Sequence, residues 1–218
     1  MSLQASDGTR LHAWWIARPD KRLATLHLHG NGGNITHRGL TARNIAAAGS
    51  SVLLLDYRGF GKSEGRPSEK GLHKDAEAAF DWITAQGYTP EQIVIHGESL
   101  GTAVATYLAT KRNCRGVVLE APLTSAKAMA GKVFPVIGPL LLWGYDSIGR
   151  IKDVHVPILV IQGDQDEVIP YAFGQQLFAA ANEPKSFWTI PGGTHNDLHD
   201  IARDEFPQRL ATFYRTLR

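Results

Sequence analysis

The amino-acid sequence predicts an α/β fold, in which a mostly parallel central β-sheet carries helices on both faces. Short runs of leucine and β-branched residues alternate with longer amphipathic stretches, which is the pattern of repeated β-α-β units. No repeat, low-complexity tract or linker divides the 218 residues. One large domain over residues 1–218 is therefore expected rather than two small ones.

Each expected strand is a short apolar run bounded by turn residues, and the Asp7-Gly8 turn precedes the first of them. Each expected helix is a longer amphipathic stretch, and Gly49 and Gly87 end the first two. The strands are expected at 11–17, 23–29, 51–55, 93–96, 116–120, 158–162 and 186–190. The helices are expected at 42–48, 70–86, 100–111, 171–181 and 197–217. Pro207 is expected to kink or interrupt the last helix.

The alternation breaks once, between residues 122 and 156, where glycines and prolines interrupt an apolar stretch. We interpret this segment as one crossover helix that is enlarged by a small insertion over the edge of the sheet.

Composition excludes several classes of protein. Lysine and arginine number 23 and aspartate and glutamate 21, so the net charge is 23 − 21 = +2, too small for a nucleic-acid or anionic-membrane surface. Cys114 is the only cysteine, so neither an intrachain disulfide nor a cysteine-built zinc site can form. No apolar run approaches the roughly 18 residues of a membrane span. A cytoplasmic protein is expected.

The sharpest chemical signal is Gly97-Glu98-Ser99-Leu100-Gly101, a G-x-S-x-G pattern. An apolar strand runs directly into it and a helical stretch runs directly out, which is the setting of a nucleophile elbow. Glycines are needed at the flanks, because so sharp a turn leaves no room for a Cβ atom there. Ser99 is therefore the candidate nucleophile. The alternative is an ordinary serine in a glycine-rich turn.

A serine hydroxyl attacks a carbonyl efficiently only when a base takes its proton and an acid holds that base. His195 lies in a loop after the last expected strand, where a histidine can reach over the edge of the sheet. The alternative is a histidine on a surface loop. Strand 158–162 ends in three carboxylates, those of Asp164, Asp166 and Glu167. The chain order serine, acid, histidine is that of elbow hydrolases.

The tetrahedral intermediate of acyl transfer needs two hydrogen-bond donors for its oxyanion. One is expected to be the backbone N–H of Leu100, the residue after the nucleophile. The other is expected from loop 29–34, whose glycines and asparagines can aim N–H groups at one point, and we favour the backbone of Asn31. The alternative is that this loop is only a flexible connection.

Three other motifs resemble binding sites for a phosphate group, a metal ion or a dinucleotide, but each lacks a residue that such a site requires. Gly59-Phe60-Gly61-Lys62-Ser63 imitates half of a phosphate-binding loop but lacks its leading glycine. His195 and His199 have the spacing of a metal pair, but Asn196 stands where the zinc-protease motif needs glutamate. Loop 30–34 lacks the third glycine of a dinucleotide turn. No cofactor and no metal ion is therefore expected.

Several motifs together resemble the α/β-hydrolase superfamily, most closely its small serine-aminopeptidase-like (S33-type) branch, which includes acyl-protein thioesterases. They occur in the family's order over nearly the whole chain: His29-Gly30-Asn31-Gly32-Gly33-Asn34, Asp56-Tyr57-Arg58-Gly59-Phe60-Gly61-Lys62-Ser63-Glu64-Gly65, Gly97-Glu98-Ser99-Leu100-Gly101, Glu120-Ala121-Pro122, Gly163-Asp164-Gln165-Asp166-Glu167-Val168-Ile169-Pro170 and Gly193-Thr194-His195. The resemblance implies an eight-stranded sheet whose first strand is short or missing. It favours Asp166 as the acid, because the family's acid is the one nearest the following Val-Ile-Pro, and it leaves Asp164 as the runner-up. Members of this branch often carry an upstream membrane anchor.

The family's variable part is a cap between the sixth and seventh strands. The segment between Glu120 and Ile158 is too short for a lid of several helices. The resemblance therefore implies a minimal cap, a small insertion at about 123–152, and an open, shallow site. Apolar residues of this segment are expected either to line an acyl pocket or simply to cover the sheet: Phe134, Val136, Leu140, Leu141, Trp143 and Tyr145.

The predicted function is that of a cofactor-independent serine hydrolase. It would cleave a carboxylic ester, a thioester or a small amide through an acyl-enzyme intermediate, with Ser99, His195 and Asp166 as the catalytic residues. Its partner would be a small-molecule or acylated-peptide substrate and no nucleic acid. Two alternatives stay open: an acyl-protein thioesterase, which the branch implies, and a non-catalytic binding module on the same fold.

Overall fold

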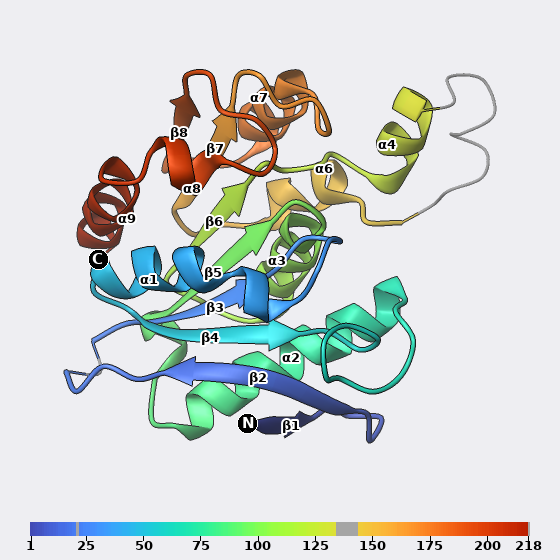
Figure 1. Cartoon of the computed structure of the whole chain (residues 1–218), viewed down its shortest axis with the longest axis vertical. Helices are drawn as coiled ribbons and strands as arrows, with labels where there is room; N and C mark the ends of the chain where they lie inside the picture. The colour runs from blue at the N-terminus through green and yellow to red at the C-terminus, as the bar shows by residue number, and fades with distance from the viewer. Residues whose placement is uncertain (21, 134–143, 218) are drawn as a thin grey trace.

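An eight-stranded sheet forms the centre of the molecule, in the order β1-β2-β4-β3-β5-β6-β7-β8 (Figure 1). The structure is a computed structural model and describes residues 1–20, 22–133 and 144–217. The strands are β1 (Ser2–Gln4), β2 (Arg10–Ile16), β3 (Ala24–Leu28), β4 (Ser51–Asp56), β5 (Ile93–Glu98), β6 (Gly116–Glu120), β7 (Ile158–Gly163) and β8 (Lys185–Ile190).

Most of the sheet is parallel. β2 runs antiparallel to β1 and to β4, and the strands from β4 to β8 along the sheet are parallel to their neighbours. β3, β4, β6 and β7 are buried at every residue, as expected for strands that are covered on both faces. The predicted fold class is confirmed. β1 has only three residues, too few for a hydrophobic pattern, and it agrees with the short first strand that the resemblance implied.

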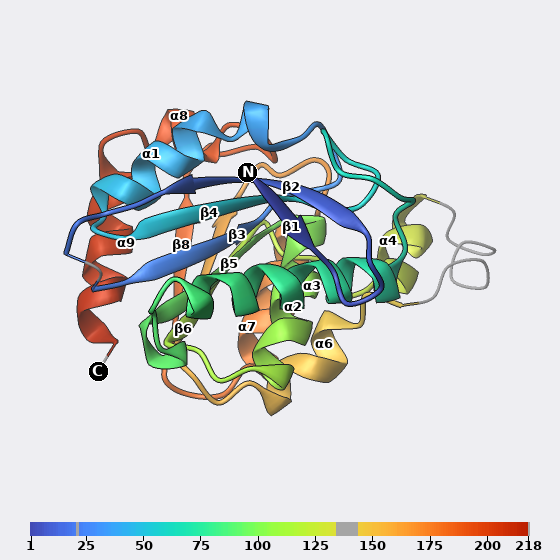
Figure 2. The same cartoon turned by 90° about the horizontal axis from the view of Figure 1, so that it is seen from below.

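Helices cover both faces of the sheet (Figure 2). Val52 and Leu54 of β4 pack in one buried cluster with the helices of one face, and Leu53 and Leu55 pack in a second cluster with those of the other. Successive side chains of this strand thus serve opposite layers. The first layer contains α1 (Gly39–Ala47), α8 (Leu198–Ile201) and α9 (Glu205–Thr216), and the second contains α2 (Glu69–Ala85), α3 (Leu100–Lys111) and α7 (Tyr171–Ala180).

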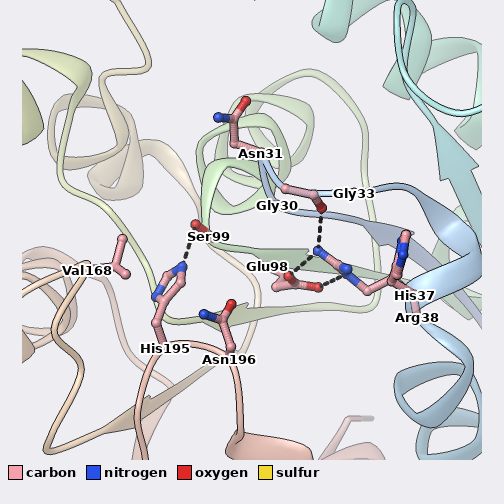
Figure 3. A pocket seen from close by; sticks show the side chains of 11 residues that line it. Gly30, Asn31, Gly33, His37, Arg38, Glu98, Ser99, Val168, His195 and Asn196 are labelled. Atoms are coloured by element: carbon pink, nitrogen blue, oxygen red, sulfur yellow. Dashed lines mark hydrogen bonds and ion pairs between the residues drawn. The ribbon is translucent and has the colours of Figure 1, made fainter.

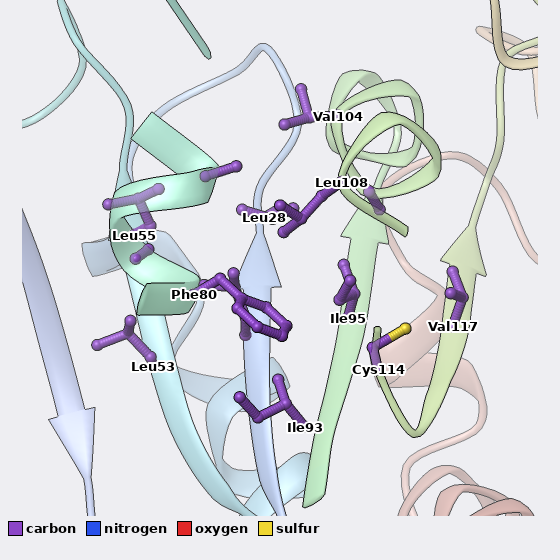
Figure 4. Close-up of a cluster of buried hydrophobic side chains, with 14 of the residues drawn as sticks. Leu28, Leu53, Leu55, Phe80, Ile93, Ile95, Val104, Leu108, Cys114 and Val117 are labelled. Carbon is purple, nitrogen blue, oxygen red and sulfur yellow. The ribbon is translucent and has the colours of Figure 1, made fainter. Parts of the chain in front are cut away.

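The second layer fixes α3 against the sheet. Phe80 of α2 and Leu108 of α3 reach onto side chains of β3, β4 and β5 (Figure 4). Both side chains are fully buried, and burying such a side chain contributes about 1.5–3 kcal/mol. This packing holds the N-terminus of α3 at the end of β5. The shorter helical segments are η1 (Ile35–His37), η2 (Pro90–Gln92), α4 (Ala126–Val133), α6 (Ser147–Arg150) and η3 (Ile151–Asp153).

The expected last helix, 197–217, is interrupted. α8 ends at Ile201 and α9 begins at Glu205, so the break comes one turn before Pro207. The proline ring would clash with the carbonyl group of residue 203, four positions earlier, and offers it no N–H. Pro207 itself lies in the first turn of α9, where a backbone N–H has no partner within the helix.

The segment that we expected to form a cap begins with α4 and ends with α6 and η3. Residues 134–143 lie outside the described residues. The small cap at about 123–152, and with it the single domain over residues 1–218, therefore stays a prediction. None of the described helices combines the length and the apolar character that crossing a bilayer requires.

Candidate active site

Ser99 stands at the sharp turn between β5 and α3. Its backbone adopts φ 52° and ψ −117°. A positive φ costs a residue with a side chain roughly 1–3 kcal/mol and persists only where the surrounding structure enforces it. Here the buried strand on one side and the packed helix on the other enforce it. Strain at a strand-to-helix turn is the property that exposes the serine of a nucleophile elbow.

The two glycines of the motif have a steric reason. A Cβ atom on Gly97 would lie 2.4 Å from the carbonyl oxygen of Gly101, and one on Gly101 would lie 1.9 Å from the carbonyl oxygen of Leu28. Real Cβ atoms essentially never approach a backbone atom within 3.0 Å. Only glycine therefore allows α3 to pack this closely on β3 and β5.

His195 brings its imidazole between Ser99 and Asp166. Its Nε2 lies 3.1 Å from Ser99 Oγ (Figure 3). Its Nδ1 lies 2.9 Å from Asp166 Oδ2. The histidine follows β8, the aspartate follows β7 and the serine follows β5, and parallel strands end at the same edge of the sheet. The structure thus brings together the three residues that the sequence singled out for a triad.

Asp166 is held in place by further hydrogen bonds. Its Oδ1 accepts the backbone N–H groups of Val168 at 2.9 Å and Ile169 at 2.7 Å, and its side chain is fully buried. Both carboxylate oxygens thus have fixed directions. Oδ2, the oxygen that faces His195, is therefore oriented to accept a hydrogen bond from that imidazole.

The other two carboxylates of this loop have different partners. Asp164 accepts the backbone N–H of Gly192 at 2.7 Å, which ties the loop after β7 to the loop after β8. Glu167 accepts the backbone N–H of His195 at 3.4 Å. Neither carboxylate bonds the imidazole of His195, which among the residues that the structure describes bonds Ser99 and Asp166.

Loop 29–34 passes beside Ser99. A Cβ atom on Gly30 would lie 3.1 Å from the Cβ of Ser99, so glycine permits this close approach. Asn31 is exposed at the rim of the cleft. Leu100 is the first residue of α3, and the helix cannot bond an N–H in that position. The role of these two residues as oxyanion donors stays a prediction.

Three side chains brace this loop. The imidazole of His29 bonds the carbonyl oxygen of Gly30 at 2.7 Å. Asp56, at the end of β4, accepts the N–H of Ile35 at 2.9 Å. Arg38 donates from Nη2 to the carbonyl oxygen of Gly32 at 3.1 Å. These contacts hold the backbone of Gly30 and Gly32 within the loop and that of Ile35 directly after it.

These elements surround a cleft of about 520 Å³ above Ser99. Among the described residues that line it, Val168 alone has an apolar side chain. The lining residues are Gly30, Asn31, Gly32, Gly33, His37, Arg38, Glu98, Ser99, Val168, His195 and Asn196.

Arg38 and Glu98 form a bidentate ion pair in the floor of the cleft. Arg38 Nε donates to Glu98 Oε2 at 2.6 Å, and Nη2 donates to Oε1 at 2.7 Å. The two side chains are 14% and 22% exposed. The pKa of Glu98 is raised, because burial disfavours the charged carboxylate more strongly than the charge of Arg38 favours it. The pair is the one bidentate arginine contact of the cleft lining that the structure describes.

A second polar cluster lies behind the cleft. Glu120, at the end of β6, lies 3.1 Å from His96 Nε2 and 3.1 Å from His199 Nε2, and Asn44 donates to the other nitrogen of His199 at 3.0 Å. Although burial opposes ionisation, the two imidazoles lower the pKa of Glu120 below its ordinary value. His199 therefore serves to anchor α8 rather than to pair with His195.

Sequence reasoning gave no role to five side chains of the cleft: His37, Arg38, Glu98, Val168 and Asn196. Glu98 offered a signal, because a carboxylate at the end of a buried strand needs a cation nearby. Nothing marks Arg38 as that cation, since it lies 60 residues earlier in the chain. Asn196 was noted only as the residue that spoils a metal motif.

Most of the expected acyl pocket cannot be placed. Phe134, Val136, Leu140, Leu141 and Trp143 lie outside the described residues. Tyr145 is half-buried against the hydrophobic core, and its backbone N–H donates to Glu69 at 2.9 Å. It packs as a side chain that covers the sheet would.

The segment 59–63 serves as a structural turn. Ser63 donates to the carbonyl oxygen of Asp56 at 2.7 Å and accepts the N–H of His12 at 2.8 Å, so its hydroxyl is engaged on both sides. In the described part of the chain, no group of three or more histidine, cysteine, aspartate or glutamate side chains could hold a metal ion.

Comparisons with known proteins point to one family. A family model described as serine aminopeptidase, S33, matches residues 19–149. The chain is 42% identical over 200 residues to protein Rv2307c of Mycobacterium tuberculosis, and the matched region covers 89% of this chain and 71% of that protein. It is 37% identical over 224 residues to the α/β hydrolase domain-containing protein WAV2 of Arabidopsis thaliana, again over 89% of this chain and 71% of that one.

A solved structure shares the fold. The esterase PF2001 of Pyrococcus furiosus superposes with a TM-score of 0.81 over 100% of this chain and 89% of its own, at 20% identity. Identity at this level shows the architecture alone.

Proposed function

Because this chain belongs to the serine aminopeptidase (S33) family of the α/β hydrolases, we propose that it is a serine hydrolase that cleaves a carboxylic ester, a thioester or a small amide. One observation carries the proposal: the hydrogen-bonded row from Ser99 through His195 to Asp166. The strained backbone at Ser99, at the end of a buried strand, supports it.

In the acylation step, Asp166 accepts a hydrogen bond from the Nδ1–H of His195, which leaves Nε2 free to take the proton of Ser99. Oγ of Ser99 bonds the carbonyl carbon as that proton moves. The imidazolium then gives the proton to the leaving atom, and the bond from the carbonyl carbon to that atom breaks. Asp166 orients the ring and stabilises its positive charge.

Deacylation repeats these steps with water as the nucleophile. Nε2 of His195 takes one proton of the water while its oxygen bonds the acyl carbon, and the proton then returns to Ser99 as the acid leaves. In both steps the N–H groups of Leu100 and Asn31 would hold the oxyanion. The positive end of the α3 dipole favours a negative charge at the same place.

Fluorophosphonate labelling tests the nucleophile, because these reagents trap an activated serine. We expect one label per chain, on Ser99, and none on the Ser99→Ala variant. Ser186, exposed on β8, provides the matched control, and Ser186→Ala should label as the wild type does. A folded protein that takes no label at Ser99 would refute the proposal.

Two aspartates of one loop test the acid. Asp166→Asn should lower kcat by about 10⁴-fold, the loss seen when the equivalent carboxylate of a serine protease is neutralised. Asp164→Asn should lower it by less than about 10-fold, because this side chain only ties two loops together. Equal losses in the two variants would contradict the assigned roles.

The two alternatives predict different results. An acyl-protein thioesterase should prefer acyl-cysteine peptides to p-nitrophenyl esters of the same acyl chain. A non-catalytic binding module should hydrolyse neither, and the Ser99→Ala variant should then bind ligand like the wild type. The described part of the cleft offers a long acyl chain only Val168 as an apolar contact, which favours the broader hydrolase proposal.

A further inference from the structure

The described side chains that line the cleft above Ser99 are mostly polar. Sites for small molecules are usually lined mainly by apolar and aromatic side chains, with a few polar groups that fix orientation. Among the described lining residues, Val168 is the single apolar side chain. The composition of this lining constrains what can be bound beside the nucleophile.

The charged side chains of the cleft do not favour a charged substrate group. Arg38 and Glu98 are the only arginine, lysine, aspartate or glutamate side chains among the described lining residues, and they pair with each other through two hydrogen bonds. A third donor bond of Arg38 goes to the backbone of Gly32. A cationic substrate group would have to compete with Arg38 for Glu98. An anionic group could bond only Nη1 of Arg38, and the charge of this guanidinium is already balanced by Glu98, so a neutral group is favoured.

Hydrogen-bonding groups remain free for such an occupant. Asn31 and Asn196 are exposed, and neither side-chain amide has a hydrogen-bond partner within the described part of the chain. The amide of Asn196 is turned toward Ser99 and Glu98 (Figure 3). Each amide offers two donors and one acceptor. A hydrocarbon would displace water from these amides without replacing its hydrogen bonds, whereas hydroxyl groups would replace them.

The proposed reaction determines which part of the substrate lies beside the side-chain amide of Asn196. His195 must protonate the leaving oxygen from Nε2, so the leaving group passes close to this imidazole. Asn196 is the next residue in the chain, and its amide faces the same space.

Resting on the proposed hydrolase function, we propose that the leaving group is a neutral polyhydroxy alcohol, of the kind found in sugars, and that Asn196 is one of the residues that bind it. The ester is split into its acid and the free polyol. The proton of Ser99 reaches the polyol oxygen through His195, and water supplies the oxygen of the acid. Val168 is left to the acyl group.

Two butyrate esters with matched leaving groups test this. Both 6-O-butyryl glucose and cyclohexylmethyl butyrate are esters of a primary alcohol in which a CH₂ group joins a six-membered ring to the ester oxygen. The ring of the first bears hydroxyl groups, and the ring of the second bears none. Each kcat/KM is divided by the ester's rate with hydroxide, which removes the difference in intrinsic reactivity. We expect the wild type to prefer the sugar ester by about 10-fold or more.

Substitutions at Asn196 then locate the effect. Asn196→Leu should lower kcat/KM for the sugar ester about 10-fold, mainly through KM, and change the cyclohexylmethyl ester less than about 2-fold. Asn196→Gln, which keeps the amide, should restore part of the loss. Asn113→Leu is the matched control, because Asn113 is exposed just beyond the far end of α3. It should leave both esters unchanged.

The possible results separate this inference from the proposed function. A wild type that prefers the cyclohexylmethyl ester, or an Asn196→Leu variant that changes both esters equally, overturns the inference while the hydrolase function stands. A second pair of esters has the same alcohol and differs only in hydroxyl groups on the acyl group. If the wild type prefers the hydroxylated ester in this pair but shows no such preference between the two alcohols, the placement of the hydroxyl groups on the leaving side is overturned. Failure to hydrolyse either ester, together with no fluorophosphonate label on Ser99, overturns both.

Discussion

The ion pair between Arg38 and Glu98 can be broken by one substitution, Arg38→Met, which keeps the length of the side chain. Removing one partner of a buried pair costs about 3–5 kcal/mol, and an exposed pair is worth about 0.2–1 kcal/mol. Since the two side chains are 14% and 22% exposed, the pair lies nearer the buried limit. We expect the free energy of unfolding to fall by about 2–3 kcal/mol at neutral pH.

The same substitution should also slow catalysis. Arg38 is a positioning residue, since it donates to the carbonyl oxygen of Gly32 in the loop that contains Asn31. Losing a whole oxyanion donor costs about 10²–10³ in kcat. Because Arg38→Met only loosens one of three braces of the loop, we expect kcat to fall by about 10-fold with KM little changed.

The pH dependence of this loss has a defined sign. Burial raises the pKa of Glu98 in the folded protein, so folding takes up a proton between the ordinary pKa of 4.5 and the raised value. Stability from this group is complete below the ordinary pKa and is lost as the pH rises through the raised one. Without Arg38 the pKa of Glu98 rises further. The stability deficit of Arg38→Met should therefore shrink as the pH is lowered.

Urea unfolding and steady-state kinetics on four proteins separate the two effects. Arg112→Met is the matched control, because Arg112 pairs with Asp81 at a more exposed site and should lose less than about 1 kcal/mol with no change in kcat. The double variant Arg38→Met/Glu98→Gln should regain most of the stability, since no charge is left unpaired. It should not regain kcat, because Gly32 still lacks its donor. Recovery of kcat in the double variant, or a wild-type kcat in Arg38→Met, would refute this account.

The remaining predictions concern His195, Gly101 and His73. His195→Ala should lower kcat by about 10⁶-fold, because the serine proton then has no base to accept it; a loss of less than about 10²-fold contradicts its role as base. Gly101→Ala should prevent stable folding or lower the free energy of unfolding by several kcal/mol, because its Cβ would meet the carbonyl oxygen of Leu28 at 1.9 Å. Gly39→Ala is the control: its Cβ would meet nothing within 4 Å, so this variant should melt at or above the wild-type temperature. Burial lowers the pKa of His73 to about 4 from its ordinary 6.5, so wild-type stability should fall as the pH drops through that interval; melting temperatures at both ends should show a smaller fall for His73→Phe.

The sequence was sufficient to predict the parallel strands and the elbow. Strands that are covered on both faces must be apolar along their whole length, so 51–55 and 158–162 stand out from any alternation. The elbow is equally local: a strand, two glycines and a helix follow one another within twenty residues. Features of this kind depend on neighbours in the chain, which a sequence displays directly.

Features that depend on distant contacts could not be read in this way. Asp164 and Asp166 lie two positions apart after the same strand, and only the path of the loop decides which one faces His195. Arg38 and Glu98 meet across 60 residues, and the sequence contains many arginines that are equally plausible partners. The interruption of the last helix was predicted without a position; it lies between Ile201 and Glu205, because a proline disturbs the carbonyl group four residues earlier rather than its own position.

The edge of the sheet that carries Ser99 is built from buried polar side chains, and this has a consequence for how the site stays rigid. Asp56, Glu98 and Glu120 end three of its strands, and each fixes a different segment: the loop 29–34, the elbow and α8. Apolar residues at these positions would often give equal or greater stability. They could not hold the N–H of Ile35, the guanidinium of Arg38 or the imidazole of His199 in a set direction, however. Arg38 in turn bonds the loop that contains Asn31, and donors that stabilise an oxyanion must not reorganise during the reaction. Stability and catalysis should therefore respond differently when such a pair is replaced as a whole.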